Sequence, residues 1–470
     1  MSEFSPISAA SPIQRCLSCR LSSLGFRFMS SSSVPSPVAT ASSKVLSFSQ
    51  IRILVLASLG GALEFYDFVI FAFLAKLIAL HFFPASQAAW LRQTEAFGLF
   101  GAGYLARPLG GIIMAHFGDI AGRKKVFTFS VLLMALPTLM MGLLPGYETL
   151  GPGAPLILLL LRMAQGAAIG GEAPGGWVFV AEHAPPGRVG LATGLLTGGL
   201  TGGILLGSLV ILALNTALAP SAVNDWGWRL PFIIGGVFGI GAMILRRWLD
   251  ETPVFREMHQ RAETASSLPA AILLRDHRFS ILCSVLTTWT LTAAIVVLIL
   301  MMPPLMQSLH HIPPSETMLA SLVATLCLTV SVVSVSALTD SISLSVMSLV
   351  CGPLLVAGAF ALYSLPAQLP HLLPVWAGLA GLCCGFVGLV PVGMLRAFPP
   401  MVRFSGVSLA YNIAYAIFGG LTPAIISSLT PYTPLAPAIY VTIAAIAGSA
   451  GLWLMDSRNL RCIQPQTAPA

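Results

Sequence analysis

Long apolar runs separated by short polar connections dominate the chain from Ile51 onward. Charges, prolines and glycine clusters divide it into segments that reach the ~20 residues needed to cross a bilayer core. A backbone group left unpaired in hydrocarbon costs several kcal/mol, so we expect each segment to be helical. The pattern predicts an all-α membrane protein with twelve transmembrane helices, at about 53–80, 94–116, 126–145, 156–181, 190–217, 229–249, 279–302, 316–337, 343–364, 373–396, 404–428 and 435–455.

The longest hydrophilic connection, Asp250 to Arg278, separates the first six segments from the last six. We therefore expect two six-helix bundles that enclose a central path, as in many secondary transporters. A channel or a membrane-embedded enzyme would share this composition. The expected parts are an N-terminal bundle at 49–250, a cytoplasmic middle loop at 251–278, a C-terminal bundle at 279–456 and a cytoplasmic tail at 457–470.

Residues 1–48 differ from the rest because they are rich in Ser and Pro and lack an apolar core segment. Three interpretations compete: a disordered cytoplasmic tail, a transit-peptide-like segment, or translation from a start codon placed too early; we favour the tail or the early start. Met29 would open a shorter chain. We exclude this segment from the expected fold.

Composition and charge placement indicate membrane topology. The 470 residues are 56% hydrophobic and only 9% charged, and the net charge is +7. The basic residues concentrate in alternate connections, which is the positive-inside asymmetry and places both termini of a multi-pass protein in the cytoplasm. We expect the protein in the cell (inner) membrane. Arg92 is the main exception. The positive charge therefore reports topology, and we expect no nucleic-acid partner.

Residue patterns for a bound cofactor or metal are missing from the sequence. Cys16 and Cys19 form one CxxC without a second pair nearby, and the remaining cysteines fall mostly in apolar segments. The glycine-rich stretch at 170–176 lies inside a span, so it is not a phosphate loop. We expect no cofactor, no metal and no catalytic activity.

Two carboxylates, Glu64 and Asp67, lie near the middle of the first span. Spaced i, i+3, they share one helical face. An ionised acid at this depth costs at least ~2.5–3.5 kcal/mol, so it should face a wet cavity or a partner. Burial raises the pKa of a carboxyl and a nearby cation lowers it, which suits a group that loads and releases a proton. We expect Asp67 to be the main proton carrier and Glu64 the second; the alternative is a pair of purely structural hydrogen bonds.

Arg107 in the second span and Arg162 in the fourth are permanent cations that need anionic partners. We expect Arg107 to pair with Asp67 or Glu64, so that a carboxylate substrate could displace the acid and couple binding to protonation. Gln165 and Glu172 follow Arg162 in the same span and join the substrate-binding candidates, as does Tyr66. A permanent salt bridge that only holds helices together is the alternative for Arg162.

Motifs in chain order carry a family resemblance. The stretch AHFGDIAGRKK at 115–125 resembles the G-x-L-A-D-R-x-G-R-K-K loop of the major facilitator superfamily, with departures that include Ala115 for the first glycine and Ile120 for the basic residue. Together with GALEFYDF at 61–68, RPLGG at 107–111 and WGWRLPF at 226–232, it resembles the metabolite:proton symporter family of that superfamily. The resemblance extends over about 400 residues.

The resemblance implies the major facilitator fold and proton-coupled import of a small polar metabolite by alternating access. The embedded arginines favour an organic acid. Uptake of a zwitterion such as proline or betaine, export of organic compounds, and a non-transporting receptor remain as alternatives. The expected partners are the substrate, protons and the lipid bilayer, and we expect a monomer.

Charged residues at the membrane edge are candidates for a gate that latches the two bundles. The loop after the eighth span is the counterpart of the 115–125 loop and keeps only the aspartate of its signature. We therefore expect a weaker or differently built gate there. The gating candidates are Asp119, Arg123, Glu182, Arg188 and Asp340.

The C-terminal bundle holds almost no embedded charge and would supply polar and aromatic contacts, for which Trp289, Tyr411 and Asn412 are candidates. In the fifth span, glycines four residues apart form two ladders, at Gly190–Gly202 and Gly199–Gly207, and predict close helix packing.

Overall fold

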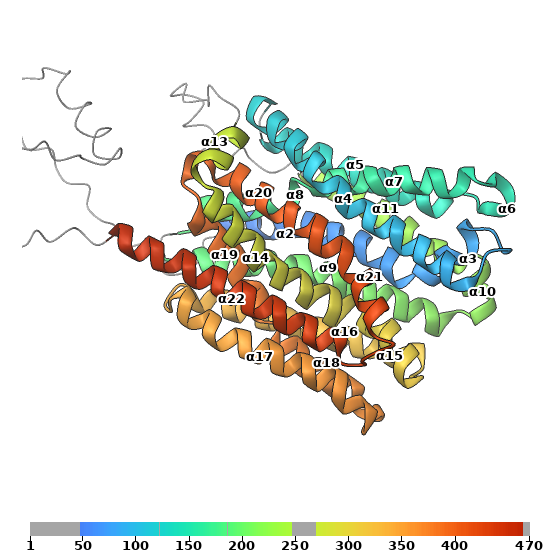
Figure 1. The fold of residues 1–470 in the computed structure, drawn as a ribbon. Helices are drawn as coiled ribbons and strands as arrows, with labels where there is room; N and C mark the ends of the chain where they lie inside the picture. The colour runs from blue at the N-terminus through green and yellow to red at the C-terminus, as the bar shows by residue number, and fades with distance from the viewer. Residues whose placement is uncertain (1–47, 122, 186, 247–268, 464–470) are drawn as a thin grey trace, which may run out of the picture. The chain divides into compact units, whose positions relative to one another are not determined.

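The structure is a computed structural model that describes residues 48–121, 123–185, 187–246 and 269–463. Every regular element in these ranges is a helix (Figure 1). Eleven helices are long and apolar enough to cross a membrane, and Phe129–Leu143 is a shorter apolar one. The twelve expected segments are therefore confirmed. Residues 1–47 and most of the expected middle loop lie outside the described residues.

The N-terminal half contains six segments, and two of them are interrupted. The first breaks at Leu74 and the fourth at Gly170 and Gly171. Its elements are α2 (Phe48–Phe73), α3 (Ala75–Phe82), α4 (Ala89–Ala121), α5 (Arg123–Leu143), α6 (Tyr147–Leu150), α7 (Gly153–Ile169), α8 (Glu172–His183), α9 (Val189–Ala217), α10 (Pro220–Asp225), η1 (Gly227–Arg229) and α11 (Leu230–Arg246).

The C-terminal half contains the other six segments. Two of them include a π-helical turn, η2 and η6. Its elements are α13 (Pro269–Asp276), α14 (Arg278–Ile295), η2 (Val296–Leu300), α15 (Met302–His310), α16 (Pro314–Leu338), α17 (Leu344–Ser364), η3 (Leu365–Ala367), η4 (Pro370–Leu372), α18 (Leu373–Cys383), α19 (Phe386–Ala397), η5 (Pro400–Val402), α20 (Arg403–Ala414), η6 (Tyr415–Gly419), α21 (Gly420–Leu429) and α22 (Ala436–Ile463).

Proline accounts for both π-helical turns. Pro303 and Pro423 each lie four residues after a residue of a π-helical turn. In an α-helix the residue at that position donates its N–H to the carbonyl four residues back, and a proline has no N–H to donate. The last helix, α22, extends to Ile463, seven residues into the tail that the sequence predicts to begin at 457.

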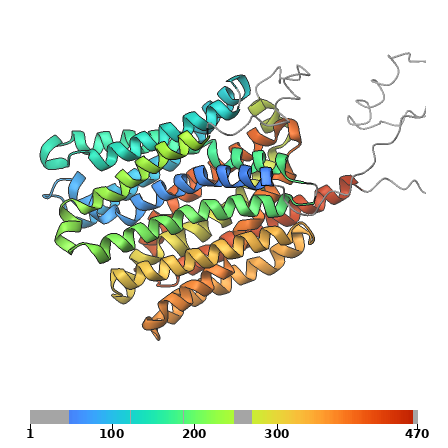
Figure 2. The same cartoon turned by 180° about the vertical axis from the view of Figure 1, so that it is seen from behind.

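The glycines of α9 form packing faces toward both halves, which agrees with the role expected from their spacing. A β-carbon added at Gly199 or Gly203 would overlap with α2, at Ser58 and Ala62. Glycines on the other ladder, including Gly194, meet α16 instead. Because these contacts lie on two sides of one helix, α9 lies beside α2 in its own half and α16 in the other (Figure 2).

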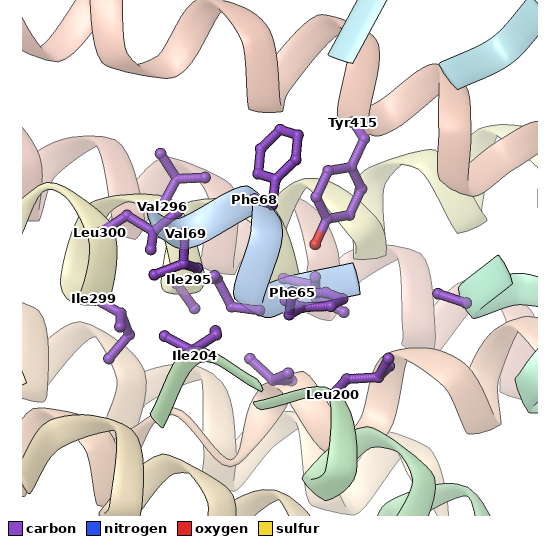
Figure 3. Packing of buried hydrophobic residues seen from close by; sticks show 14 of the residues in the cluster. Phe65, Phe68, Val69, Leu200, Ile204, Ile295, Val296, Ile299, Leu300 and Tyr415 are labelled. Atoms are coloured by element: carbon purple, nitrogen blue, oxygen red, sulfur yellow. The ribbon is translucent and has the colours of Figure 1, made fainter. Parts of the chain in front are cut away.

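Apolar side chains from both halves meet in one buried cluster, shown in Figure 3. From the N-terminal half, α2 contributes Phe65, Phe68 and Val69, and α9 contributes residues including Ile204. The C-terminal half contributes the end of α14, η2 and Tyr415 of η6. The polar residues of α2 described below therefore lie on a helix that is otherwise enclosed by hydrophobic packing.

Candidate functional site

Asp67 lies inside the N-terminal half, where only 2% of its surface is exposed. Its Oδ2 accepts a hydrogen bond of 2.7 Å from the Thr138 hydroxyl on α5. Its Oδ1 faces α11 so closely that a β-carbon added at Gly235 would stand 2.5 Å away. Oδ1 has no hydrogen-bond partner in the described part of the chain. The carboxyl group is thus held between α2, α5 and α11 with one oxygen bonded and one not.

A chain of hydrogen bonds connects this carboxyl group to an arginine. The Gln165 amide nitrogen donates to the Thr138 oxygen at 2.6 Å. The Gln165 amide oxygen accepts from Arg162 Nη1 at 2.7 Å. Gln165 and Arg162 both belong to α7, at i+3 spacing, which places them on one helical face. Asp67 and Arg162 therefore belong to one polar network that crosses three helices.

Arg162 is fully buried and is surrounded mainly by aromatic rings. Its guanidinium carbon lies 4.8 Å from the ring centre of Phe68 and 4.2 Å from that of Phe71. Its Nε and Nη2 have no hydrogen-bond partner among the described residues. Desolvated cation–π contacts contribute about 2 kcal/mol or more, which offsets only part of the cost of burying a cation. Arg162 is therefore a cation that could accept an anionic ligand.

Arg107 of α4 also contacts Phe68 and has 2% of its surface exposed. Its guanidinium carbon is 5.1 Å from the Phe68 ring centre, 4.9 Å from that of Tyr104 and 4.6 Å from that of Tyr415. Tyr415 belongs to η6 of the C-terminal half. Arg107 is thus in contact with both halves.

The expected ion pair between Arg107 and Asp67 is wrong for this structure, since the described partner of Asp67 is Thr138. Successive residues of an α-helix point about 100° apart. Phe68 faces the two arginines, whereas Asp67 faces α5 and α11. The side chain of Glu64 lies outside the described residues, so its pairing with Arg107 stays a prediction.

Two further N-terminal candidates make contacts within their own half. The Tyr66 hydroxyl donates to the Pro231 carbonyl at 2.8 Å, which fixes α2 to the start of α11. Glu172, in the first turn of α8, accepts a hydrogen bond of 2.7 Å from Ser130. In this conformation these two side chains connect helices, and their assignment to substrate binding stays a prediction.

Asn412 and Tyr411 of α20 reach across to the interrupted fourth segment. Pro174 cannot donate a backbone hydrogen bond to the Gly170 carbonyl. That carbonyl instead accepts from the Asn412 amide at 2.5 Å and from Ser408 at 3.2 Å. The Tyr411 ring packs edge-on against Trp177 of α8, with centroids 5.1 Å apart. Both candidates therefore lie at the interface between the halves.

Trp289, the third C-terminal candidate, is engaged inside its own half. Its ring stacks on Phe418 at 4.4 Å, and its indole nitrogen donates to the Tyr440 hydroxyl at 2.9 Å. Tyr440 belongs to α22, which packs along α14. The structure does not bring Trp289 together with the two arginines, because its indole is directed toward α22.

Asp340 makes a bridge between the halves. Its two carboxylate oxygens accept from the backbone N–H groups of Gly190, at 2.6 Å, and Leu191, at 3.0 Å. These groups open α9, and a carboxylate at a helix N-terminus satisfies donors that the helix leaves free. Glu182 and Arg188 are half-buried at the end of α8 and the start of α9. The side chains of Asp119 and Arg123 lie outside the described residues.

Apolar residues line a groove of about 590 Å³ between α4 and α21, which includes Gly98, Gly101, Leu105 and Ala424. A smaller cavity of about 140 Å³ adjoins η2 and includes Phe100 and Leu300. Neither of these two spaces is lined by a charged residue.

Thr138 is the main site residue that sequence reasoning missed. A lone threonine in an apolar span satisfies its hydroxyl by bonding to the carbonyl four residues back, and Thr138 does make this bond, to Met134 at 2.9 Å. The one signal in the sequence was indirect: the buried Asp67 carboxylate needs a hydrogen-bond donor, and a helix packed against its own must supply it. Phe68, Tyr104 and Tyr415 were likewise hidden among ordinary core aromatics.

Comparisons with known proteins agree with this architecture. The family model described as "Sugar (and other) transporter" matches residues 53–277. A structure of the proton:xylose symporter XylE bound to 6-bromo-6-deoxy-D-glucose superposes with a TM-score of 0.71, at 15% identity, and the match covers 86% of this chain and 95% of that one. At that identity the likeness shows the fold alone.

Relatives similar in sequence are transporters rather than enzymes. The Proline/betaine transporter of Escherichia coli (strain K12) is 28% identical over 426 residues, which cover 86% of this chain and 83% of that protein. The Citrate-proton symporter of Klebsiella pneumoniae is 32% identical over 411 residues, 86% of this chain and 91% of that protein. On this evidence the chain belongs to the metabolite:proton symporter family of the major facilitator superfamily and is a multi-pass membrane transporter.

Proposed function

We propose that this transporter imports a small organic acid together with protons by alternating access. The observation that carries the proposal is the network from Asp67 through Thr138 and Gln165 to Arg162. It joins a buried group that can bind a proton to a buried cation that can bind a carboxylate. Such a connection is what a symporter needs, because loading one ligand must alter the affinity for the other.

Asp67 is the proposed proton carrier. Its Oδ2 is bonded to the Thr138 hydroxyl, which can accept as well as donate, so Oδ2 can take up a proton and keep this hydrogen bond. Protonation removes a negative charge from the network that contains Arg162. A substrate carboxylate bound at Arg162 would then replace that charge, which favours simultaneous binding of proton and substrate. Glu64 would support Asp67 from one turn away on α2.

The two arginines are the proposed carboxylate-binding groups. Both are buried and both contact Phe68, so one substrate that displaces this ring could reach both guanidinium groups. A guanidinium binds a carboxylate through two parallel hydrogen bonds. Asn412 and Tyr411 lie at the same interface between the halves and are proposed to contact the rest of the substrate.

A zwitterion such as proline or betaine is the second candidate substrate. The observation that favours it is the group of aromatic rings around Arg107, formed by Phe68, Tyr104 and Tyr415. Aromatic rings grouped in this way bind quaternary ammonium ions through cation–π interaction. A relative named as a proline/betaine transporter supports this candidate as much as the citrate-proton symporter supports the first.

Both termini are proposed to lie in the cytoplasm, with the protein in the cell inner membrane as a monomer. Arg188, Arg246 and Arg396 are at helix ends on the proposed cytoplasmic side. Arg229, at an opposite end, is used structurally, because it donates to the carbonyls of Gly142 and Leu144. On this orientation Asp340 latches the cytoplasmic side, and the charged loop that holds Asp119 and Arg123 is proposed to reinforce it.

Uptake into proteoliposomes under an imposed inward proton gradient tests the proposal. Radiolabelled citrate, glycine betaine and proline are the probes, and an uncoupler is the control. We expect the proton gradient to drive accumulation of citrate and the uncoupler to abolish it. Arg162→Gln should raise the KM for citrate at least tenfold. Accumulation of betaine or proline instead would favour the second candidate. Binding without flux, or extrusion driven by the gradient, would overturn symport and favour a receptor or an exporter.

A further inference from the structure

Thr138 Oγ1 is placed between three polar atoms. It lies 2.7 Å from Asp67 Oδ2, 2.9 Å from the Met134 carbonyl oxygen and 2.6 Å from the Gln165 amide nitrogen. A hydroxyl group has one hydrogen to donate and two lone pairs that accept. All three neighbours can therefore bond to Thr138 at once only if two of them donate to its oxygen and the third accepts its hydrogen.

Arg162 fixes the direction of the bonds. A guanidinium can only donate, so the Gln165 atom that faces it must be the amide oxygen. The Gln165 amide nitrogen is then the group that faces Thr138, and it donates to the threonine oxygen. Consequently the single hydrogen of Thr138 must go to one of two acceptors, Asp67 Oδ2 or the Met134 carbonyl.

The protonation state of Asp67 decides between these acceptors. When Asp67 is ionised, the threonine hydrogen points to Oδ2 and stabilises the charge. When Oδ2 carries a proton, Asp67 becomes the donor, its O–H bonds to the remaining lone pair of Thr138, and the threonine hydrogen turns to Met134. Only the hydroxyl torsion changes, and no covalent bond in Thr138 breaks. Thr138 stays bonded to Asp67 and to Gln165 in both states, and its hydroxyl bonds the Met134 carbonyl only when Asp67 is protonated.

We propose that Thr138 is a positioning residue for proton coupling, whose hydroxyl reverses between Asp67 and the Met134 carbonyl, and that Gln165 transmits this reversal to Arg162. The inference rests on the proposed role of Asp67 as proton carrier and adds the route by which its state reaches the substrate-binding arginine. Gln165 bonds more strongly to a threonine oxygen that is not also accepting from Asp67. Proton release would therefore alter how firmly Gln165 holds the Arg162 guanidinium.

The surroundings of Asp67 support this route over a direct one. On its own helix, α2, the neighbouring groups are Tyr66 and Glu64, whose side chain lies outside the described residues. The packed helices contribute Thr138 of α5, Arg162 and Gln165 of α7, and Gly235 of α11. Tyr104 and Arg107 of α4 follow at the Phe68 ring. Tyr66 is engaged with the Pro231 carbonyl. Among the described groups, Thr138 alone donates to the Asp67 carboxylate.

Substitution of Thr138 by isosteric valine tests the inference, with serine as the rescue. The threonine bond to the ionised carboxylate is about twice as strong as the bond in the neutral state. Valine therefore harms the ionised state more, and we expect the pH midpoint of substrate exchange in proteoliposomes to move about one pH unit more alkaline. Thr138→Ser should restore the wild-type midpoint. Thr442→Val is the matched control, because within the described part of the chain the Thr442 hydroxyl bonds only to the Ala438 carbonyl of its own helix.

The outcomes separate this inference from the proposed function. If Asp67→Asn still accumulates substrate under the proton gradient, the proposed function fails. If Asp67→Asn loses accumulation but Thr138→Val keeps the wild-type pH midpoint, or serine does not rescue it, only the threonine switch fails. A double variant, Asp67→Asn with Thr138→Val, should behave as Asp67→Asn alone. If Thr138→Val does not fold, Thr138→Cys replaces it, because a thiol is a weaker donor of similar size. This variant should shift the pH midpoint in the same direction by a smaller amount. An unchanged midpoint would overturn the switch.

Discussion

Removal of the Asp340 carboxylate should open the side of the protein that it bridges. Asp340 accepts two backbone hydrogen bonds, at 2.6 and 3.0 Å, from the first turn of α9. A hydrogen bond to a charged group contributes about 1.5–3 kcal/mol, and a carboxylate at a helix N-terminus adds about 0.3–1 kcal/mol. Asp340 is half-buried, so solvent screens part of both effects, and we expect about 2–3 kcal/mol for the whole contact.

That free energy would lower the ratio of bridged to unbridged molecules roughly 30- to 140-fold in Asp340→Ala, since about 1.4 kcal/mol corresponds to a factor of ten. Ser336 reports the change, because it is fully buried behind the bridge, where α9 and α16 meet. With Ser336→Cys as a probe, modification by a water-soluble maleimide, quantified at that position by mass spectrometry, should accelerate by the same factor.

Asp456→Ala is the matched control for this measurement. Asp456 is also half-buried and also bonds the start of a helix, the Ser345 backbone and hydroxyl of α17, but both partners belong to the C-terminal half. Its loss should lower the thermal stability without accelerating the modification. An unchanged modification rate in Asp340→Ala, or an equal acceleration in Asp456→Ala, would refute the reasoning.

Two further predictions concern the interior of the protein. Gly235→Ala places a β-carbon 2.5 Å from Asp67 Oδ1, so it should abolish gradient-driven uptake, whereas Gly241→Ala, with open space at its β-carbon, should leave uptake at the wild-type level; equal uptake in the two variants would contradict this. Asn412→Ala should lower the unfolding free energy by about 0.5–1.5 kcal/mol in thermal-denaturation measurements, because the buried Gly170 carbonyl then keeps only the longer hydrogen bond from Ser408. Adding Pro174→Ala should recover part of that loss, since alanine supplies the missing helical donor, and independent effects of the two substitutions would argue against the explanation.

The helices could be predicted from the sequence because membrane hydrocarbon leaves the backbone no other choice. The burial of Asp67, Arg107 and Arg162 was likewise predictable, since each lies far from the ends of an apolar segment. The glycine faces of α9 followed from their four-residue spacing.

The pairing of the charged residues could not be predicted, because α2 is apolar on nearly all sides and its sequence does not reveal which side meets α5 and which meets α4. A rotation of about 100° separates Asp67 from Phe68, and helix packing sets that rotation. The contact at Asp340 was hidden for another reason. Its partners are backbone N–H groups, which every residue except proline carries, so the sequence around Gly190 gives no sign of them.

Substitutions at the two glycine faces of α9 should have two different effects on transport. A side chain at Gly203 would collide with the backbone of Ala62 in the same half, and because that contact belongs to one bundle, the collision persists through the transport cycle. A β-carbon at Gly198 would meet only side-chain methyl groups, that of Val333 at 2.7 Å and that of Thr329 at 3.7 Å, across the interface that must separate. Alanine at Gly203 should therefore appear as a null allele, whereas alanine at Gly198 should appear as a second-site suppressor of variants that are trapped with the halves closed.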